Sequence, residues 1–266
     1  MGRPWTGHLT IGEGWALFVG ASGDNEAHAH HALQLGVSAG SPLSVTSHTG
    51  PPTRACAVAI SARRPHKVQV DAARLGLLFL DPDGDQGRAL ARLLEPSGLA
   101  SVSGPAVEAL RSAIEAVDLQ ELKAAGARAI AASIVSLWLP NQTEGGAREV
   151  ARPAVDPRVV AARLLAREKL SAGRVRVAAL AESAGLSPSR FAAIFRRDTG
   201  VPLRAFVLWA RVQRAVEVVA AGHSFTDAAL MAGFADAAHL SRTFRRMFGT
   251  TLSGGVGRLR IAVLRS

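Results

Sequence analysis

Two copies of one short pattern occupy the last third of this chain. The first copy joins Ala-Gly-Leu at positions 184–186 to Phe-Arg-Arg at 195–197, and the second joins Ala-Gly-Phe at 232–234 to Phe-Arg-Arg at 244–246. In each copy the spacing predicts a short apolar helix, a tight turn at the glycine and a second helix that carries the arginine pair. This arrangement is typical of a helix-turn-helix, and two of them in tandem on a basic segment indicate the reading of double-stranded DNA.

The turns and the spacer between the copies have physical requirements that this chain meets. Gly185 and Gly233 stand where a left-handed backbone is needed, and glycine adopts that backbone at little cost. Residues 202–221 are predicted to form one helix of about 30 Å, at ~1.5 Å per residue, which is close to the ~34 Å of one duplex turn. The predicted cores are Leu180, Leu186, Phe191, Ile194 and Phe195 in the first copy, and Ala229, Leu230, Phe234, Leu240 and Phe244 in the second.

Positive charge is concentrated in the part of the chain that holds the repeat. Residues 156–266 contain 18 Arg and Lys against 7 Asp and Glu, a net charge of +11, whereas residues 1–155 have a net charge of −1. Such an asymmetry favours a domain that binds a polyanion joined to a neutral domain.

The first half of the chain has a different character. Short apolar runs separated by Gly, Pro, Ser and Asp predict closely spaced strands of an all-β barrel. Residues 86–94, 105–117 and 119–139 then show helical spacing, and the last two are predicted to form a helical pair behind the barrel. Their apolar stripe needs a cover, either a second subunit or the barrel itself. The predicted strand runs are 15–20, 32–37, 43–46, 56–60, 68–70 and 75–80.

These changes in character define the expected domains. We expect a first domain at 1–140, a linker rich in Gly, Pro and charge at 141–156, a helical domain at 157–252 and a tail at 253–266. Cys56 is the only cysteine, which excludes an internal disulfide and a cysteine-based zinc finger. Residues 1–15 lack the pattern of a secretory signal, and no apolar stretch is long enough to span a bilayer. We therefore expect a soluble, cytoplasmic protein with no membrane partner.

Residues 157–252 resemble the DNA-binding domain of the AraC family of bacterial transcription regulators. The stretch from Thr226 to Gly249, including Leu-Ser-Arg-Thr-Phe-Arg-Arg-Met-Phe-Gly at 240–249, carries this resemblance most closely. The segments 28–35 and 64–66 resemble the cupin-like sensory barrel common in the same family. The resemblance implies an α+β fold of two domains: an N-terminal cupin-like β-barrel with a helical pair, and a C-terminal all-α tandem helix-turn-helix joined by a long helix.

The family pattern also implies which side chains meet DNA. Several of the base-facing positions are alanines, which can touch a thymine methyl but donate no hydrogen bond, so direct readout would rest chiefly on Arg190, His239 and Arg242. Two alternatives stay open, since Arg242 could pair with Asp236 and His239 could be a packed side chain. The implied base-facing residues are Ser189, Arg190, Ala192, Ala193, Ala237, Ala238, His239 and Arg242, and the implied phosphate contacts are Arg196, Arg197, Arg245 and Arg246.

A group of histidines in the first half is the candidate ligand site. On a strand, His28 and His30 would share one face with Gln34, and His66 follows later in the chain. Metal-binding cupins place a carboxylate near the position of Gln34, so we predict no tightly held metal and no cofactor, and instead a polar ligand pocket or a structural cluster. Asp81, Asp83 and Asp85 imitate the start of a calcium loop, but a turn is the favoured interpretation.

The sequence thus predicts a sequence-specific transcription regulator and not an enzyme. Its expected partners are double-stranded DNA, a small-molecule effector, a second copy of the chain and RNA polymerase. Two alternatives from other classes remain. A metal-dependent cupin enzyme fused to a DNA-binding domain would need a metal on His28, His30 and His66, and an architectural DNA-binding protein would bind any duplex equally.

Overall fold

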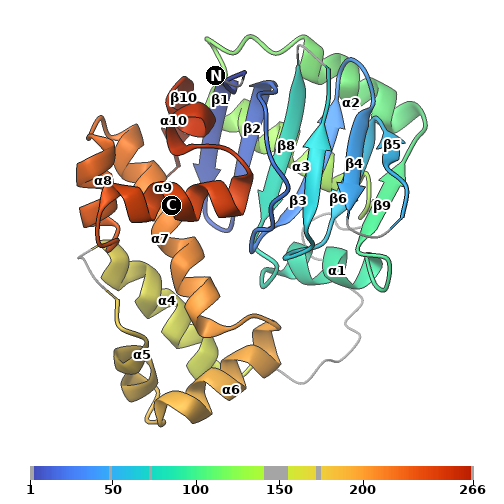
Figure 1. The fold of residues 1–266 in the computed structure, drawn as a ribbon. Coiled ribbons are helices and arrows are strands. Elements are labelled where there is room, and N and C mark those ends of the chain that lie inside the picture. Colours follow the sequence, from blue (N-terminus) through green and yellow to red (C-terminus); the bar gives the residue numbers. More distant parts are fainter. Residues whose placement is uncertain (1–2, 48–49, 72–73, 141–154, 172–174, 265–266) are drawn as a thin grey trace. The chain divides into compact units, whose positions relative to one another are not determined.

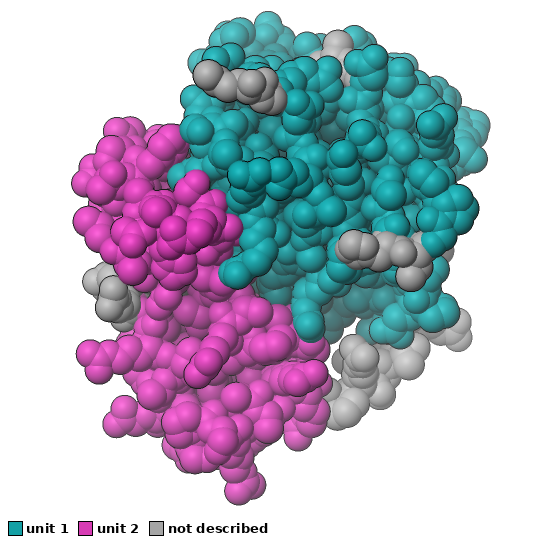
Figure 2. Space-filling model, viewed as in Figure 1, with its two compact units in different colours: residues 1–147, 244–266 teal, residues 148–243 magenta. Residues whose placement is uncertain are grey.

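The computed structural model describes residues 3–47, 50–71, 74–140, 155–171 and 175–264. They fall into two compact units, one of residues 1–147 with 244–266 and one of residues 148–243 (Figure 2). Most of the predicted linker lies outside the described residues. No helix in the described ranges is long and apolar enough to cross a membrane.

Two β-sheets form the centre of the first unit (Figure 1). The larger has seven strands in the order β10-β1-β2-β8-β3-β6-β9, and the smaller has the order β5-β4-β7. Neighbouring strands are antiparallel except for β1 and β10, which are parallel. The strands are β1 (Thr6–Gly12), β2 (Trp15–Ala21), β3 (Leu33–Ser38), β4 (Leu43–Ser47), β5 (Thr53–Ala55), β6 (Ala57–Ile60), β7 (His66–Gln69), β8 (Leu75–Leu80), β9 (Leu99–Val102) and β10 (Leu259–Val263).

The larger sheet is buried on both faces because its strands alternate two sets of apolar residues. Phe18, Val58 and Leu77 belong to a core that they share with Leu43 and Val68 of the smaller sheet. The opposite face packs on helices, and its apolar residues include Leu17, Val19, Leu33, Leu35 and Leu78. The six predicted strand runs are confirmed within a few residues, whereas β1, β5, β9 and β10 were not predicted.

Three helices follow or interrupt the strands of this unit. They are α1 (Asp85–Leu93), α2 (Pro105–Glu115) and α3 (Ala124–Ser136), and Figure 1 shows α2 and α3 against one face of the larger sheet. Their apolar stripe, with Val107, Ile114 and Ile134, is buried in the core shared with that sheet. The sheet of the same chain therefore supplies the cover that the stripe needs, so the stripe itself gives no argument for a second subunit.

The end of the chain also belongs to the first unit. The short helix α10 (Leu252–Val256) is followed by β10, which pairs with β1 in a parallel register from Gly7↔Leu259 to Ile11↔Val263. The sequence pattern assigns 244–252 to the helical domain and no structure to the tail from 253. The structure corrects both points, because strand pairing with β1 attaches this segment to the first unit.

The second unit consists of helices, as predicted. Its first helix-turn-helix buries Leu180, Phe191 and Phe195, with Leu186 and Ile194 packed at the edge, which confirms the predicted core. In the second copy Leu230 is 57% exposed, so its assignment to the core is wrong; Ala228 and Ala229 are the buried residues of that helix. The helices are α4 (Pro157–Ser171), α5 (Val177–Ser183), α6 (Pro188–Thr199), α7 (Leu203–Ala220), α8 (Phe225–Met231) and α9 (Ala237–Phe248), whose last residues count with the first unit.

The two turns of the tandem motif have the same hydrogen-bond pattern. Gly185 has φ +64° and Gly233 has φ +80°, so both adopt the predicted left-handed backbone. The amide of Leu186 donates to the carbonyl of Ala181 at 3.0 Å, and the amide of Phe234 donates to that of Ala229 at 2.9 Å. These bonds satisfy a carbonyl that the preceding helix leaves open at its end, and they fix the angle at which each second helix starts.

Candidate DNA-binding surface and histidine cluster

The first reader helix, α6, begins with a capping serine. The hydroxyl of Ser187 accepts a hydrogen bond from the amide of Arg190 at 3.4 Å, and Pro188 occupies the first helical position. Ser189, Arg190 and Ala193 are exposed and Ala192 is half-buried. Because Phe191 and Phe195 hold the opposite face in the core, these residues form one polar and small-residue surface that faces solvent.

The arginine pair of α6 is divided between two environments. Arg196 is exposed, and no ion pair involves it among the described residues. Arg197 instead pairs with Asp198 at 2.5 Å, and this interaction lowers the pKa of Asp198. The same carboxylate accepts the amide of Asp156 at 2.9 Å, so Arg197 helps to attach the residue that precedes α4. Arg197 would have to leave that ion pair to meet a phosphate.

The second reader helix, α9, is capped as the sequence predicts. Asp236 accepts a hydrogen bond from the amide of His239 at 2.5 Å. The ring of His239 lies edge-on to Phe234 with 5.2 Å between the ring centres. This contact favours the alternative in which His239 is a packed side chain. Arg242 is exposed and has no ion pair with Asp236 or with any other described residue. Ala238 is exposed and Ala237 is half-buried, so Arg242 is the polar side chain of this face most open to solvent.

The last turn of α9 has a contact that the sequence did not predict. Arg245 donates two hydrogen bonds to the carboxylate of Glu26, from Nε at 3.1 Å and from Nη2 to the other oxygen. This pair lowers the pKa of Glu26 below its usual range. Arg246 is exposed and has no partner among the described residues.

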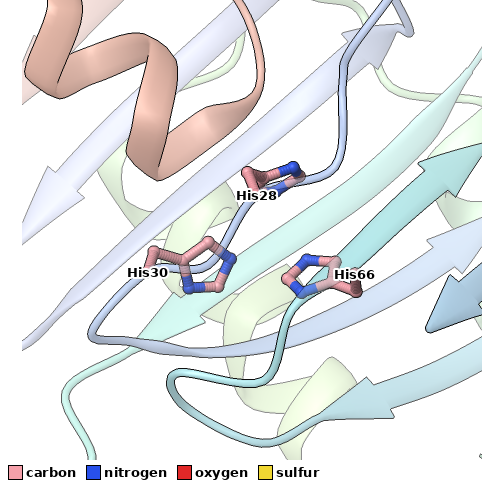
Figure 3. A group of neighbouring side chains, drawn as sticks. All are labelled: His28, His30 and His66. Atoms are coloured by element: carbon pink, nitrogen blue, oxygen red, sulfur yellow. The ribbon is translucent and has the colours of Figure 1, made fainter. Parts of the chain in front are cut away.

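His28, His30 and His66 come together as predicted, although not on one strand (Figure 3). His28 and His30 lie in the segment before β3, where His28 forms an isolated bridge with His66 of β7. The prediction that they alternate along a strand is wrong, because an irregular segment brings them to this position. One ring nitrogen from each histidine lies within 4.8 Å of the others, and Gln34 of β3 completes the cluster.

Hydrogen bonds to the backbone fix the tautomer of each ring. Nδ1 of His28, His30 and His66 lies 2.8 to 2.9 Å from the carbonyls of Glu26, Ala32 and Arg64, respectively. A carbonyl can only accept, so each Nδ1 carries the hydrogen and each Nε2 offers a lone pair. Oε1 of the Gln34 amide lies 2.8 Å from Nε2 of His30 and 3.1 Å from Nε2 of His66. Because the two ends of a carboxamide have nearly the same shape, Gln34 can turn its NH2 group to both rings and satisfy them.

Burial keeps these rings neutral. Removal from water, together with the neighbouring histidines, lowers the pKa of His28 to about 4 and that of His66 to about 3. The pKa of His30 is also lowered by burial. Chemically, the rings could ligate a divalent transition metal through Nε2, and a Gln34 amide turned with its NH2 group toward them would use two of the three lone pairs.

A second group that could hold a cation consists of His31, Asp81 and Asp83. All three side chains are largely buried, with 3.9 Å between Nε2 of His31 and Oδ1 of Asp81. Asp81 also accepts the amide of Asp83 at 3.1 Å, which confirms the predicted turn before α1. Sequence reasoning treated the aspartates alone and missed His31, since nothing in the local pattern connects residues fifty positions apart.

A polar groove of about 660 Å³ lies beside the smaller sheet of the first unit. Its lining includes Arg54, Lys67 and Gln69 from the strands and Arg3 from the N-terminal segment. No local sequence pattern predicts this groove, because residues from five separate segments line it.

Comparisons with known proteins agree with this architecture. Residues 180–254 match the family described as a helix-turn-helix domain, and no curated protein matches the chain. A single-residue variant of apo ToxT from Vibrio cholerae strain SCE256 superposes with a TM-score of 0.59 at 10% identity, covering 90% of this chain and 96% of that chain. ToxT from Vibrio cholerae O395 gives a TM-score of 0.57 at 10% identity, with coverages of 91% and 96%.

Wild-type ToxT from strain SCE256, solved with a bound unsaturated fatty acid, gives a TM-score of 0.52 at 9% identity and covers 97% of this chain and 96% of that chain. At these identities the likeness is one of fold. It extends over both units, so the α+β, two-domain fold class is confirmed.

Proposed function

We propose that the chain is a DNA-binding transcription regulator of the AraC type, which reads its operator with the exposed faces of α6 and α9 while its first unit senses a signal. The observation that carries this proposal is the equivalence of the two helix-turn-helix copies. Both have the same glycine turn, an N-terminal side-chain cap and an exposed face at the start of the second helix. A helix start with this exposure is the part of such a motif that contacts bases in the major groove.

We assign different tasks to the exposed side chains of the two helices. Arg190 and Arg242 can each donate two hydrogen bonds to a guanine edge, which is worth ~1–3 kcal/mol of discrimination. Ser189 and the alanines 192, 193, 237 and 238 allow close approach and contact with thymine methyls. Arg196 and Arg246 are proposed phosphate contacts, because they are exposed near the ends of their helices. His239 supports the helix through Phe234 more than it reads a base.

The experiment begins with a genome-wide footprint of the bound protein, which supplies the operator. Full-length protein is then titrated with operator and with random duplex by fluorescence anisotropy across a salt series. We expect operator binding to be tighter by at least a thousandfold and both affinities to fall steeply with salt, since phosphate contacts release counterions. Equal affinity for both duplexes would favour the architectural alternative. No binding at low salt would overturn the assignment.

The remaining partners follow from the same proposal. A small-molecule effector would bind the first unit, at the histidine cluster or in the polar groove lined by Arg54 and Lys67. A homodimer would use the outward faces of α2 and α3, and sedimentation of the full-length chain tests it. Contact with RNA polymerase and a cytoplasmic location follow from a role in transcription. We propose that the chain acts by binding alone, because Gln34 stands beside His30 and His66 where a metal-dependent cupin enzyme would need a carboxylate ligand.

A further inference from the structure

We infer that the polar groove beside the smaller sheet binds a small hydroxylated molecule that carries a phosphate ester, with Arg54 and Lys67 as the clamp on the phosphate. The inference rests on the proposed function, since such a molecule would be the effector of the regulator. The groove belongs to the first compact unit alone, because every residue that lines it lies between positions 3 and 71.

The floor of the groove is the outward face of the smaller sheet. Successive residues of a strand point to opposite faces, and Leu43, Val45 and Val68 belong to the core shared with the larger sheet. Ser44 and Lys67 alternate with them and therefore face away from that core. The groove thus has polar side chains on a base whose other side is packed.

Strand pairing brings the two cations of the clamp to one region of this face. Ser44 pairs with Arg54 of β5, and Thr46, the next outward residue of β4, pairs with Lys67 of β7. Paired residues share a face, strands lie ~4.8 Å apart, and residues on one face of a strand lie ~6.8 Å apart, so the two Cα atoms are separated by roughly 12 Å. Two long side chains that start at this separation can converge on one anion above Ser44.

Charge is distributed unevenly along the groove. At one end Arg3 is engaged, because its amide donates to Oδ2 of Asp24 at 2.7 Å and its Nη1 lies 3.7 Å from Oδ1 of Asp71. At the other end, neither Arg54 nor Lys67 forms an ion pair with any residue that the structure describes. The positive charge available to a ligand is therefore concentrated at Arg54 and Lys67.

Glu26 lies near this end and does not cancel its charge. A hydrogen bond and the charge of Arg245, and more weakly the charge of Lys67, lower the pKa of Glu26. Its carboxylate receives two hydrogen bonds from Arg245 and stays outside ion-pair distance of Lys67. The ammonium of Lys67 is thus left for an anion in the groove.

These charges select the chemical class of the ligand. Two cations match a phosphate monoester, which carries close to two negative charges at neutral pH and offers three strong acceptor oxygens. The planar guanidinium of Arg54 can hold two of these oxygens, and the ammonium of Lys67 can meet the third as a point charge. A single carboxylate would leave one of the two cations unmatched.

The rest of the lining selects a polar body for the ligand. Ser41, Ser44 and Gln69 line the groove with hydroxyl and amide groups. Val68 and Val70 also line it, but their side chains are buried in the core, so few apolar contacts are offered. The volume of about 660 Å³ is that of a small-molecule site. Hydroxyl groups on the ligand would satisfy this lining, whereas a hydrocarbon tail would not.

Isothermal titration calorimetry of the full-length chain tests the class, with ribose phosphate as the probe. Ribonate has a similar hydroxylated body with one negative charge, and inorganic phosphate is the head group alone. We expect ribose phosphate to bind about tenfold more tightly than ribonate, because a charge-assisted contact is gained, and more tightly than inorganic phosphate. Equal affinity for ribonate would overturn the phosphate ester, and equal affinity for inorganic phosphate would overturn the hydroxylated body.

Three variants with the same change of charge test the location. Arg54→Gln and Lys67→Gln each remove one cation of the clamp, and Arg92→Gln is the matched control, since Arg92 is an exposed residue of α1 that does not line the groove. The clamp variants should bind ribose phosphate about five- to tenfold more weakly, and Arg92→Gln should bind it as the wild type does. An equal loss in Arg92→Gln, or an unchanged affinity in both clamp variants, would overturn the inference.

Operator DNA separates a failure of this inference from a failure of the proposed function. Without ribose phosphate, Arg54→Gln and Lys67→Gln should bind operator as tightly as the wild type, because neither residue belongs to α6 or α9. Weaker operator binding with a smaller salt slope would make the groove a contact for duplex phosphates and overturn the inference. Normal operator binding without saturable binding of ribose phosphate at millimolar concentration would also overturn it. Binding of ribose phosphate by a chain that binds no duplex at low salt would instead reject the proposed function.

Discussion

Gly249→Ala should weaken the attachment of the C-terminal segment far more than the same change weakens the turn at Gly185. The two glycines have nearly equal φ values, +68° and +64°, so an alanine is strained by about 1–2 kcal/mol at either position. A Cβ on Gly185 would meet no atom within 4 Å, whereas a Cβ on Gly249 would lie 2.2 Å from the carbonyl oxygen of Glu26. The backbone of Gly249 must therefore move away from Glu26.

The movement has a cost that can be worked from the contacts it breaks. Loss of the amide bond from Glu26 to Gly249 removes about 0.5–1.5 kcal/mol, and loss of the exposed pair with Arg245 removes about 0.2–1 kcal/mol. The excess over Gly185→Ala is thus about 0.7–2.5 kcal/mol. We expect the amides of β10 to exchange with deuterium roughly 3- to 70-fold faster in Gly249→Ala, as local opening becomes easier.

Hydrogen exchange resolved by peptide measures this, with Gly185→Ala as the matched variant. In Gly185→Ala only the amides around α5 and α6 should exchange faster. If β10 keeps its wild-type exchange rate in Gly249→Ala, the close approach of Gly249 to Glu26 does not hold the segment in solution, and the reasoning fails.

Three other predictions concern the reader helix and the histidine cluster. Arg242→Ala should weaken binding to the operator more than to random duplex, whereas Arg246→Ala should weaken both about equally and lower the salt slope by roughly one; a uniform loss for Arg242→Ala would make it a phosphate contact. Elemental analysis of protein purified without chelator should find no stoichiometric transition metal, and a metal that is lost in His30→Ala would contradict this. The pKa values of about 4 for His28 and about 3 for His66 lie below the unfolded value of 6.5, so the stability that the neutral rings contribute is complete above pH 6.5 and is lost as the pH falls toward 4. Urea unfolding at pH 5.5 should show a loss of about 1.4 kcal/mol for each of these two rings relative to neutral pH, and His66→Gln should reduce that loss; a loss unchanged in His66→Gln would contradict it.

Local chemistry made the helical unit predictable. The left-handed glycines, the caps at Ser187 and Asp236 and the aromatic residues at helical spacing act within a few residues, so their pattern is visible in the chain. The prediction that Leu230 lies in the core was wrong because α8 has apolar residues on two faces. Only packing decides that the buried face carries Ala228 and Ala229. The exposure of Arg242 likewise depends on the fold around it.

The histidine cluster was predictable in membership and not in geometry. The spacing of His28, His30 and Gln34 indicated one site, but the irregular backbone before β3 and the bridge from His28 to His66 come from tertiary structure. The ion pair of Arg245 with Glu26 joins residues 219 positions apart, and no local pattern connects them. The role of β10 was hidden for the same reason, since its partner strand lies at the other end of the chain.

The pairing of β10 with β1 also orders events during synthesis. Gly7 pairs with Leu259, which is synthesised 252 residues later. At about 5–20 residues per second, translation of that stretch takes roughly 13–50 s. Throughout that interval one edge of β1 presents unpaired backbone groups, which are the groups that recruit strands from other chains. The helix-turn-helix units, whose contacts are local, can fold in the meantime. High-level expression at high temperature should therefore favour aggregation through the edge of β1 before β10 has been synthesised.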